Sequence, residues 1–279
     1  MATTQTRSRG RPRLESVEKQ GTTIQALDRG INLLCILSKE GKATLTELAL
    51  RIGMPPSSAH RILSTLQKKS FVEFHETTQE WMIGVEAFRV GNSFVQANKL
   101  VAIGIEVMQS LVEETGETSN LAIANDGLVV VLNQVETRYP IRALFPAGTC
   151  VHMHASSVGK ALLAGLRRRD VELILQTKGL PEFTPKTLTS PDMLFSDLEK
   201  TRKRGWALDD EEHHFGMRCI AAPIFNAGGE AIAGISISGP TVRMHDERLP
   251  ELATKVKNAA IEVTNLTGGT QPKSGYNLL

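Results

Sequence analysis

The chain has 279 residues, of which 41% are hydrophobic and 22% charged, and its formal net charge at pH 7 is +2. This composition is typical of a soluble protein with one or two globular domains, and no apolar run reaches the roughly 18 residues that span a membrane. The three cysteines, Cys35, Cys150 and Cys219, are too few and too scattered for a disulfide framework or a Cys-based zinc site, which favours a cytoplasmic protein.

Positive charge is concentrated in the N-terminal part of the chain. The first 100 residues contain 14 Lys and Arg against 9 Asp and Glu, whereas the rest contain 18 against 21. Residues 1–22 have little apolar content, so we expect a flexible Arg-rich arm. Within it, Arg9, Arg11 and Arg13 form an Arg-Gly-Arg-Pro-Arg segment that is narrow enough to enter an A·T-rich minor groove, as an AT-hook does. The alternative is a basic tail that only increases solubility.

Three helices are predicted after the arm. Residues 24–39 have an apolar stripe at helical spacing, made of Ile24, Leu27, Ile31, Leu34 and Leu37. A second helix is expected to begin at Thr44, because Thr44 and Glu47 have the S/T-x-x-E spacing of a capping box. Gly53 suits the left-handed position that ends this helix, and the Pro-Pro pair that follows is compatible with the start of a third.

The third helix has one apolar face and one small polar face. The side expected to be buried carries Ala59, Ile62, Leu63 and Leu66. The other side carries Ser57, Ser58, His60 and Arg61. A face without carboxylates suits a helix that lies in a DNA major groove, where an acid would be repelled by phosphate. An ordinary helical hairpin with a solvated face is the alternative.

A β-hairpin is predicted for residues 71–83, where two apolar, aromatic segments flank a polar turn. Helix, helix-turn-helix and hairpin is the order of a winged helix, so residues 23–84 are predicted to form a DNA-binding domain. Residues 85–115 again have helical periodicity. We expect residues 85–100 to form a linker helix and the second domain to begin at residue 101.

The second half of the chain mixes strand and helix patterns. Asp126-Gly127 between two apolar segments predicts a two-residue hairpin turn. Further strands are expected at Ile141–Phe145, 206–209, 218–225 and 231–238. Helices are expected at 156–166, with a serine cap at Ser156, and at 170–177, 190–204 and 245–266. This pattern favours an α+β domain with an antiparallel sheet over residues 101–268, followed by a loose tail at 269–279.

Five segments carry a resemblance to a known family: QALDRGINLL, LTELALRIGMPPSSAHRIL, HASSVGKALLA, GWALDDEEHHFGMRCIAAPIF and GISISGP. From Ile24 to Leu266 the chain resembles the IclR family of bacterial transcription regulators. The resemblance implies an N-terminal winged helix-turn-helix, a linker helix and a C-terminal GAF-like effector domain. It also implies a homodimer, usually paired into a dimer of dimers, on double-stranded DNA with a palindromic operator.

Within that family, the effector half is most similar to the glyoxylate-responding branch, in which a small 2-oxo acid lies against the sheet. The positions carried over are the backbone amides of Ser157 and Val158 and the side chains of Asp209, Cys219, Ser236 and Ser238. Ser157 and Val158 begin a predicted helix, where free N–H groups favour a carboxylate. Ser236 and Ser238 are two apart on a predicted strand, so their hydroxyls share a face.

The candidate apolar walls of the effector site are Leu144, Ala147 and Met153. Family members often have Ser-Gly-Ala-Gly where this chain has Ser156-Ser157-Val158-Gly159. The larger Val158 would narrow the pocket. The resemblance makes glyoxylate the first expectation for the effector, and pyruvate or an aromatic acid is the alternative.

Enzymatic interpretations are weaker. Cys219 with His213 or His214 would make a Cys-His pair, but a buried cysteine on a strand is commoner. The candidate metal ligands are His152, His154, His213 and His214, which no carboxylate completes into a clear set. We therefore expect no catalytic residue, no metal and no cofactor.

Two further alternatives are also disfavoured. Ser157 and Lys160 have S-x-x-K spacing, but the accompanying S-D-N and K-T-G motifs are absent, so Lys160 is expected on a helix surface. A sensor that has lost DNA binding would not need the basic helix pair or the Arg-rich arm.

Overall fold

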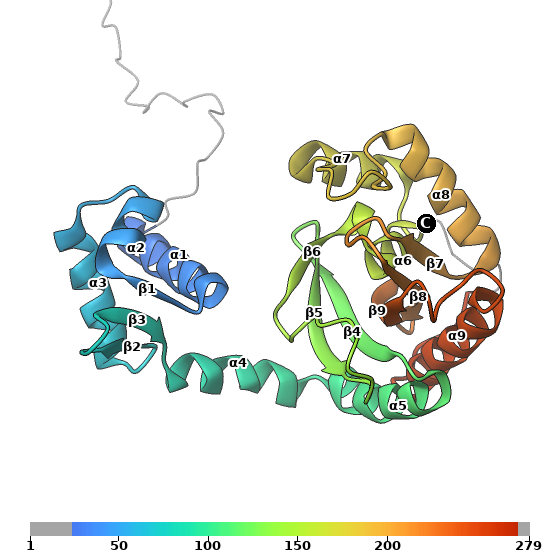
Figure 1. Ribbon diagram of the computed structural model, residues 1–279, viewed down its shortest axis with the longest axis horizontal. Coiled ribbons are helices and arrows are strands. Elements are labelled where there is room, and N and C mark those ends of the chain that lie inside the picture. The colour runs from blue at the N-terminus through green and yellow to red at the C-terminus, as the bar shows by residue number, and fades with distance from the viewer. Residues whose placement is uncertain (1–23, 273–279) are drawn as a thin grey trace, which may run out of the picture. The chain divides into compact units, whose positions relative to one another are not determined.

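The computed structural model describes residues 24–272, which divide between Ser93 and Phe94 into two compact units (Figure 1). The predicted arm with Arg9, Arg11 and Arg13 lies outside the described residues. Within residues 24–272, no helix combines the length and the apolar character needed to cross a membrane.

The first unit has three helices and a small antiparallel sheet of order β1-β3-β2. Its elements are α1 (Gln25–Glu40), β1 (Lys42–Thr44), α2 (Leu45–Ile52), α3 (Pro56–Lys68), β2 (Val72–His75) and β3 (Glu80–Ile83). Its core contains Leu33, Leu37, Leu48, Leu63 and Trp81. The predicted helices and hairpin are confirmed, and the short strand β1 was not predicted. Together the helices and the hairpin form a winged helix-turn-helix.

The turn between α2 and α3 has the predicted chemistry. The Thr44 hydroxyl accepts from the Glu47 N–H while the Glu47 carboxylate accepts from the Thr44 N–H, so the capping box is complete. Gly53 ends α2 with φ 66°. These local features hold α2 and α3 as a helix pair.

The apolar stripe predicted for α1 is only partly buried. Leu37 is fully buried, but Ile24, Leu27 and Ile31 are 70%, 58% and 52% exposed. The face of α1 that packs on the core is instead Gly30, Leu33 and Leu37. Gly30 faces Ile62 of α3, and a Cβ there would make an ordinary contact of 3.5 Å with the Ile62 side chain.

Residues 85–115 form two helices rather than one. Helix α4 (Val85–Ala97) has no buried residue, whereas α5 (Lys99–Thr115) buries seven. Asn98 separates them, and its side chain accepts a hydrogen bond from the Leu100 N–H at the start of α5. The apolar face of α5 packs in the core of the second unit.

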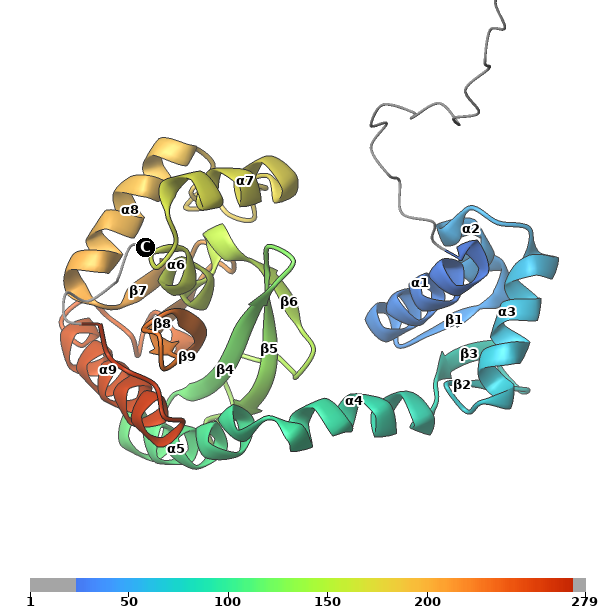
Figure 2. The same cartoon turned by 180° about the vertical axis from the view of Figure 1, so that it is seen from behind.

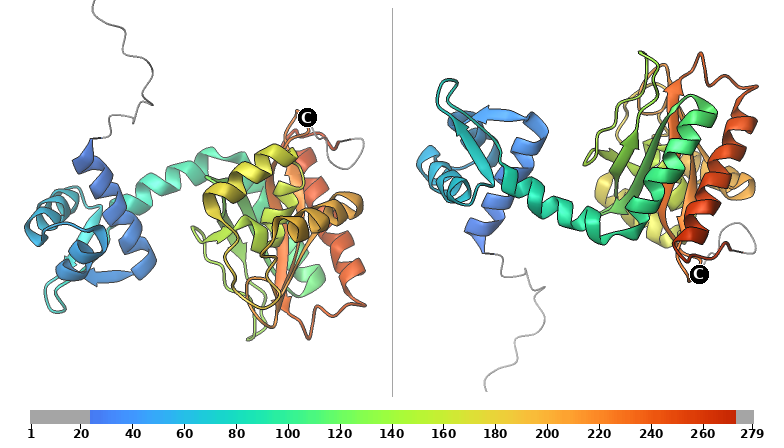
Figure 3. Two further views of the ribbon diagram at one scale, coloured as in Figure 1. Left: turned by 90° about the horizontal axis from the view of Figure 1, so that it is seen from above. Right: turned by 90° about the horizontal axis from the view of Figure 1, so that it is seen from below.

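The second unit is built on a six-stranded antiparallel sheet of order β6-β5-β4-β9-β8-β7. The strands are β4 (Thr118–Asn125), β5 (Leu128–Val135), β6 (Cys150–His152), β7 (Ala207–Asp210), β8 (Met217–Phe225) and β9 (Ala231–Pro240). Helices α5 and α9 (Leu249–Leu266) cover one face (Figures 2 and 3). The other face is covered by the short helix η1 (Met153–Ala155), α6 (Ser157–Leu163), α7 (Arg168–Lys178) and α8 (Pro191–Arg204).

One predicted turn of this unit is confirmed and one predicted strand is wrong. Asp126 and Gly127 both have positive φ, 47° and 69°, as a tight turn between β4 and β5 requires. Residues 141–145 have no regular structure. Pro140 and Pro146 flank this segment and have no N–H for a sheet. Residues 150–152 pair with β5 in its place.

Candidate functional site

Helix α3 presents the polar face that the sequence predicts. Ser57, His60 and Arg61 are exposed and Ser58 is half-buried, while Ala59 and Leu63 pack inward. Within residues 24–272, no carboxylate forms an ion pair with Arg61, so its guanidinium is not engaged by this part of the chain. An exposed arginine among small polar residues is suited to contact phosphate or a guanine edge.

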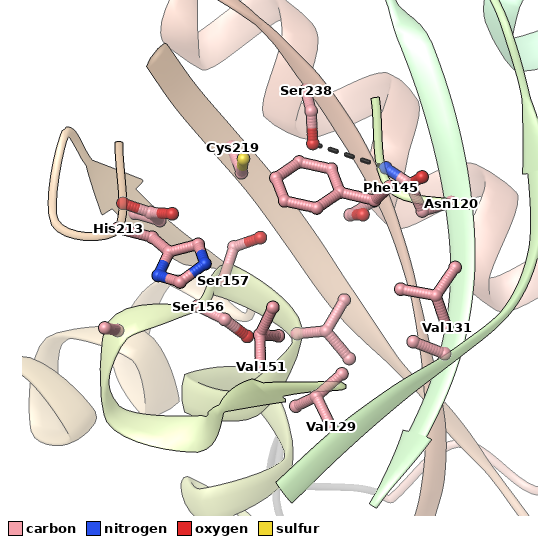
Figure 4. Close-up of a pocket in the computed structure, with 15 residues that line it drawn as sticks. Asn120, Val129, Val131, Phe145, Val151, Ser156, Ser157, His213, Cys219 and Ser238 are labelled. Atoms are coloured by element: carbon pink, nitrogen blue, oxygen red, sulfur yellow. Dashed lines mark hydrogen bonds between the residues drawn. The ribbon is translucent and has the colours of Figure 1, made fainter. Parts of the chain in front are cut away.

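The second unit has a small cavity of about 40 Å3 between α6 and the sheet. All six residues predicted for the effector site line it: Ser157, Val158, Asp209, Cys219, Ser236 and Ser238. Figure 4 shows Ser157 on one side of the cavity and Cys219 and Ser238 on the sheet opposite. A single buried water needs about 10–15 Å3 on this measure, so the cavity suits a ligand of a few heavy atoms.

The sheet side of the cavity is set by strand register. Ser236 and Ser238 lie two apart on β9 and therefore share a face. Cys219 pairs with Ser238, and Asp209 pairs with Cys219. Directly paired residues of antiparallel strands point to the same face. The register thus brings residues far apart in the sequence to one side of the cavity.

The helix side is set by close packing at the start of α6. Ser156 caps the helix, since its hydroxyl accepts from the Gly159 N–H at 2.9 Å. A Cβ on Gly159 would lie 2.2 Å from the Met153 carbonyl oxygen, so only glycine fits there. Val158 packs over Gly234 of β9, where a Cβ would come within 2.8 Å of Cγ1. The amides of the first turn have no acceptor within the helix and lie beside the cavity.

Asp209 is 5% exposed, and its Oδ1 accepts a hydrogen bond of 2.8 Å from the Glu212 N–H. Burial raises the pKa of the Asp209 carboxyl to about 6, although nearby Lys160 and the backbone N–H groups of Glu212 and His213 act in the opposite direction. At neutral pH the carboxylate is therefore an acceptor for hydroxyl or thiol groups in the cavity.

Lys160 does not lie on the helix surface, so the prediction of a surface lysine is wrong. Its side chain is fully buried, with Nζ 2.5 Å from Glu212 Oε1 and 3.0 Å from Asp197 Oδ2. The short helix α6 is buried along its whole length, so its periodicity does not separate an exposed face from a buried one. The paired acids come from α8 and from the segment after β7, which spacing within α6 cannot reveal.

The walls of the cavity differ from those expected. Met153 is buried but does not line the cavity, and Leu144 and Ala147 are exposed. The apolar lining is instead Ala122, Val129, Val131, Phe145, Val151 and Ala155. Three further polar residues line the cavity and were not predicted for the effector site: Asn120, Ser156 and His213. The sequence around Asn120 does not single it out, because it follows Thr118 and Ser119 in the polar first part of β4.

The residues considered for catalysis lack the environment of a nucleophile. Burial, and next the charge of Asp209, raise the pKa of the Cys219 thiol, which disfavours the reactive thiolate. Burial lowers the pKa of His213 to about 4. Within residues 24–272, no group of three or more His, Cys, Asp or Glu side chains is arranged to hold a metal ion.

Both units of the chain match families of known proteins. Residues 26–76 match the IclR helix-turn-helix domain, and residues 93–265 match the bacterial transcriptional regulator IclR C-terminal domain. The chain is 47% identical over 264 residues to the HTH-type transcriptional regulator BhcR of Paracoccus denitrificans, covering 93% of this chain and 94% of that protein. It is 44% identical over 249 residues to the transcriptional repressor IclR of Escherichia coli, covering 88% and 91%.

Solved structures of other proteins have the same fold. The crystal structure of the Thermotoga maritima IclR has 28% identity and a TM-score of 0.70, and the match covers 88% of this chain and all of that one. An IclR transcriptional regulator from Alicyclobacillus acidocaldarius, at 22% identity, has the same fold with a TM-score of 0.80 over 88% of this chain and 100% of that one. The relatives are named as regulators or repressors, not enzymes. The chain belongs to the IclR family of bacterial DNA-binding transcription regulators.

Proposed function

We propose that a small 2-oxo carboxylate, glyoxylate first and pyruvate second, binds in the cavity of the second unit and modulates operator binding. The observation that carries this proposal is the convergence of four polar side chains on one small cavity. These are Asp209, Cys219, Ser236 and Ser238, which face the first turn of α6. The ligand carboxylate would take the amides of Ser157 and Val158 and one serine, and its carbonyl or hydrate would take the other serine and Asp209.

Size and polarity both favour a ligand of two or three carbons. A large apolar ligand would exceed about 40 Å3 and would leave buried polar groups unpaired, at a cost of about 1–3 kcal/mol each. A two- or three-carbon acid satisfies most of them at once. An aromatic acid is the alternative ligand class, because the apolar lining includes Phe145 and four valines. It would require the cavity to expand around its ring.

For the DNA side, we propose that Ser57, Ser58, His60 and Arg61 of α3 contact the operator. Arg9, Arg11 and Arg13 of the arm would add contacts in the minor groove. In this assignment residues 1–22 are the arm, 23–84 the DNA-binding domain, 85–100 the linker, 101–268 the effector domain and 269–279 the tail. The regulator would act in the cytoplasm as a homodimer or a dimer of dimers, because one α3 helix covers only a few base pairs of a palindromic operator.

A mobility-shift assay tests this function directly. Full-length protein is mixed with DNA from upstream of its own coding region, with and without glyoxylate. We expect a specific complex whose amount or mobility changes with glyoxylate, and light scattering should give a dimer or tetramer. A complex that glyoxylate and pyruvate leave unchanged would refute the proposed effectors, and a monomer both free and on DNA would refute the assembly.

A further inference from the structure

A row of hydrogen-bonding side chains crosses the sheet on the face that α6 covers. It runs from Gln134 on β5 through Asn120 on β4 and Ser238 on β9 to Cys219 on β8 and Asp209 on β7. In the register of the sheet, Asn120 pairs with Gln134. Cys219 pairs with Ser238 on one side and with Asp209 on the other. Asn120 pairs with Ser236, which lies two residues before Ser238 on the same face of β9, so the row steps diagonally between β4 and β9.

The contacts along this row are short. Gln134 Nε2 lies 2.8 Å from Asn120 Oδ1. Asn120 Nδ2 lies 3.3 Å from Ser238 Oγ, the contact drawn as a dashed line in Figure 4. Cys219 lies between Ser238 and Asp209, its pairing partners on β9 and β7. Gln134 does not line the cavity, whereas the other four members do.

Gln134 sets the orientation of the Asn120 amide. The Gln134 amide nitrogen donates to the Asn120 carbonyl oxygen, which leaves the Asn120 nitrogen on the side of Ser238. The Asn120 nitrogen in turn donates to the Ser238 hydroxyl oxygen.

The Asn120 amide has one donor left over. Its nitrogen carries two protons, and one of them is used by Ser238. Within residues 24–272, Ser238 is the only hydrogen-bond acceptor found for this nitrogen. Asn120 is only 4% exposed, and it lines the cavity. A buried N–H beside an enclosed space needs an acceptor, which a ligand can supply.

We propose that Asn120 is a further ligand-binding residue, which donates its second N–H to the carbonyl or hydrate oxygen of the acid. Gln134 is the positioning residue that keeps the amide nitrogen turned toward the cavity. This inference rests on the proposed function, because it names a contact to the same ligand. The contact also predicts that the cavity binds a 2-oxo acid rather than the corresponding amino acid. An oxygen at the second carbon can accept this N–H, whereas the ammonium group of glycine has no lone pair.

Reversing the polarity of Gln134 tests the inference. In the variant Gln134→Glu, an ionised carboxylate accepts instead of donating. The Asn120 amide then turns its N–H groups toward Glu and its carbonyl toward Ser238 and the cavity. Asn133→Asp is the matched control, since it adds the same charge one residue earlier on β5, where the side chain points to the opposite face.

Calorimetry with glyoxylate is done on full-length wild type and both variants at about pH 8 and about pH 4, on either side of the ordinary titration of a glutamate. At the higher pH, Gln134→Glu should weaken binding by about tenfold or more, since a ligand hydrogen bond is lost and an acceptor faces an acceptor. At the lower pH the protonated carboxyl donates again, so the ratio of the variant Kd to the wild-type Kd should return toward one. Asn133→Asp should bind as wild type at both pH values.

Two results would overturn the inference. One is that Gln134→Glu binds glyoxylate as tightly as wild type at the higher pH, and the other is that its defect is equal at both pH values. If wild type binds neither glyoxylate nor pyruvate, the proposed ligand class is wrong and the inference fails with it. If wild type binds and Gln134→Glu is unaffected, only the inference fails.

Discussion

Lys160 and Glu212 form a buried ion pair beside the cavity, with 2.5 Å between Nζ and Oε1. Asp197 of α8 lies 3.0 Å from the same ammonium group, and the Asp209 carboxylate acts on it electrostatically. Three carboxylates therefore share one buried positive charge. The pair ties α6 to the segment that directly follows β7, the strand with Asp209, and so holds the helix side of the cavity against its sheet side.

Lys160→Met should strongly destabilise the second unit, because it removes the charge and leaves buried carboxylates unpaired. We expect a loss of about 3–5 kcal/mol in the free energy of unfolding, measured by urea denaturation. Lys255→Met is the matched control: Lys255 pairs with Glu251 on the surface of α9, and its loss should cost about 0–1 kcal/mol. A cost for Lys160→Met as small as that of the control would show that the buried pair has no structural role.

The free energy of unfolding should depend on pH through two of these buried acids, Glu212 and Asp209. Burial raises the pKa of Glu212 to about 7 and that of Asp209 to about 6. The folded protein therefore holds protons that the unfolded chain releases, and stability should fall as pH rises from the ordinary carboxyl range to about 7. Urea denaturation between about pH 5 and pH 8 measures this slope, and Glu212→Gln should reduce it.

Glu211 provides the control for this prediction. It pairs with Lys186 at 2.5 Å, and this hydrogen bond lowers its pKa, so it stays ionised throughout the same pH range. Glu211→Gln should leave the slope unchanged. If Glu212→Gln and Glu211→Gln had the same slope as wild type, Glu212 would not titrate in this range.

Arg61→Ala should weaken specific operator binding by about 1–3 kcal/mol if the arginine reads a guanine. Arg51 is the control, because Glu40 already engages its guanidinium and it lies on α2 rather than on the polar face of α3. Mobility-shift titrations with operator and with unrelated DNA separate specific from general affinity. Equal operator affinity in wild type and Arg61→Ala would remove this residue from recognition.

Local signals in the sequence predict much of the fold. The capping box at Thr44, the turn at Asp126-Gly127 and the serine cap at Ser156 each depend on neighbouring residues, and the structure has all three. The strand expected at residues 141–145 failed because an apolar segment alone does not supply a pairing partner. Strand β6 was missed because only three residues of it pair with β5.

The candidate site could be predicted only in part, because its residues come from elements that are distant in the sequence. The spacing of Ser236 and Ser238 predicts a shared face, and the family resemblance supplies Asp209 and Cys219. The pairing of β4 with β9 brings Asn120 to these residues. The sequence does not show this pairing, because Asn120 and Ser238 are 118 residues apart in the chain. The burial of Lys160 likewise depends on acids that reach it from other elements.

The most direct test of the account is calorimetry with glyoxylate, pyruvate and an aromatic acid on wild type and on the double variant Ser236→Ala, Ser238→Ala. Ser119→Ala is the control, because Ser119 is a buried serine next to Asn120 on β4 and so faces away from the cavity. Wild type and the control should bind glyoxylate with a Kd between about micromolar and millimolar, since few ligand atoms limit the binding energy. The double variant should lose this binding and keep its affinity for operator DNA. Tight binding of the aromatic acid with no heat from glyoxylate would contradict the account.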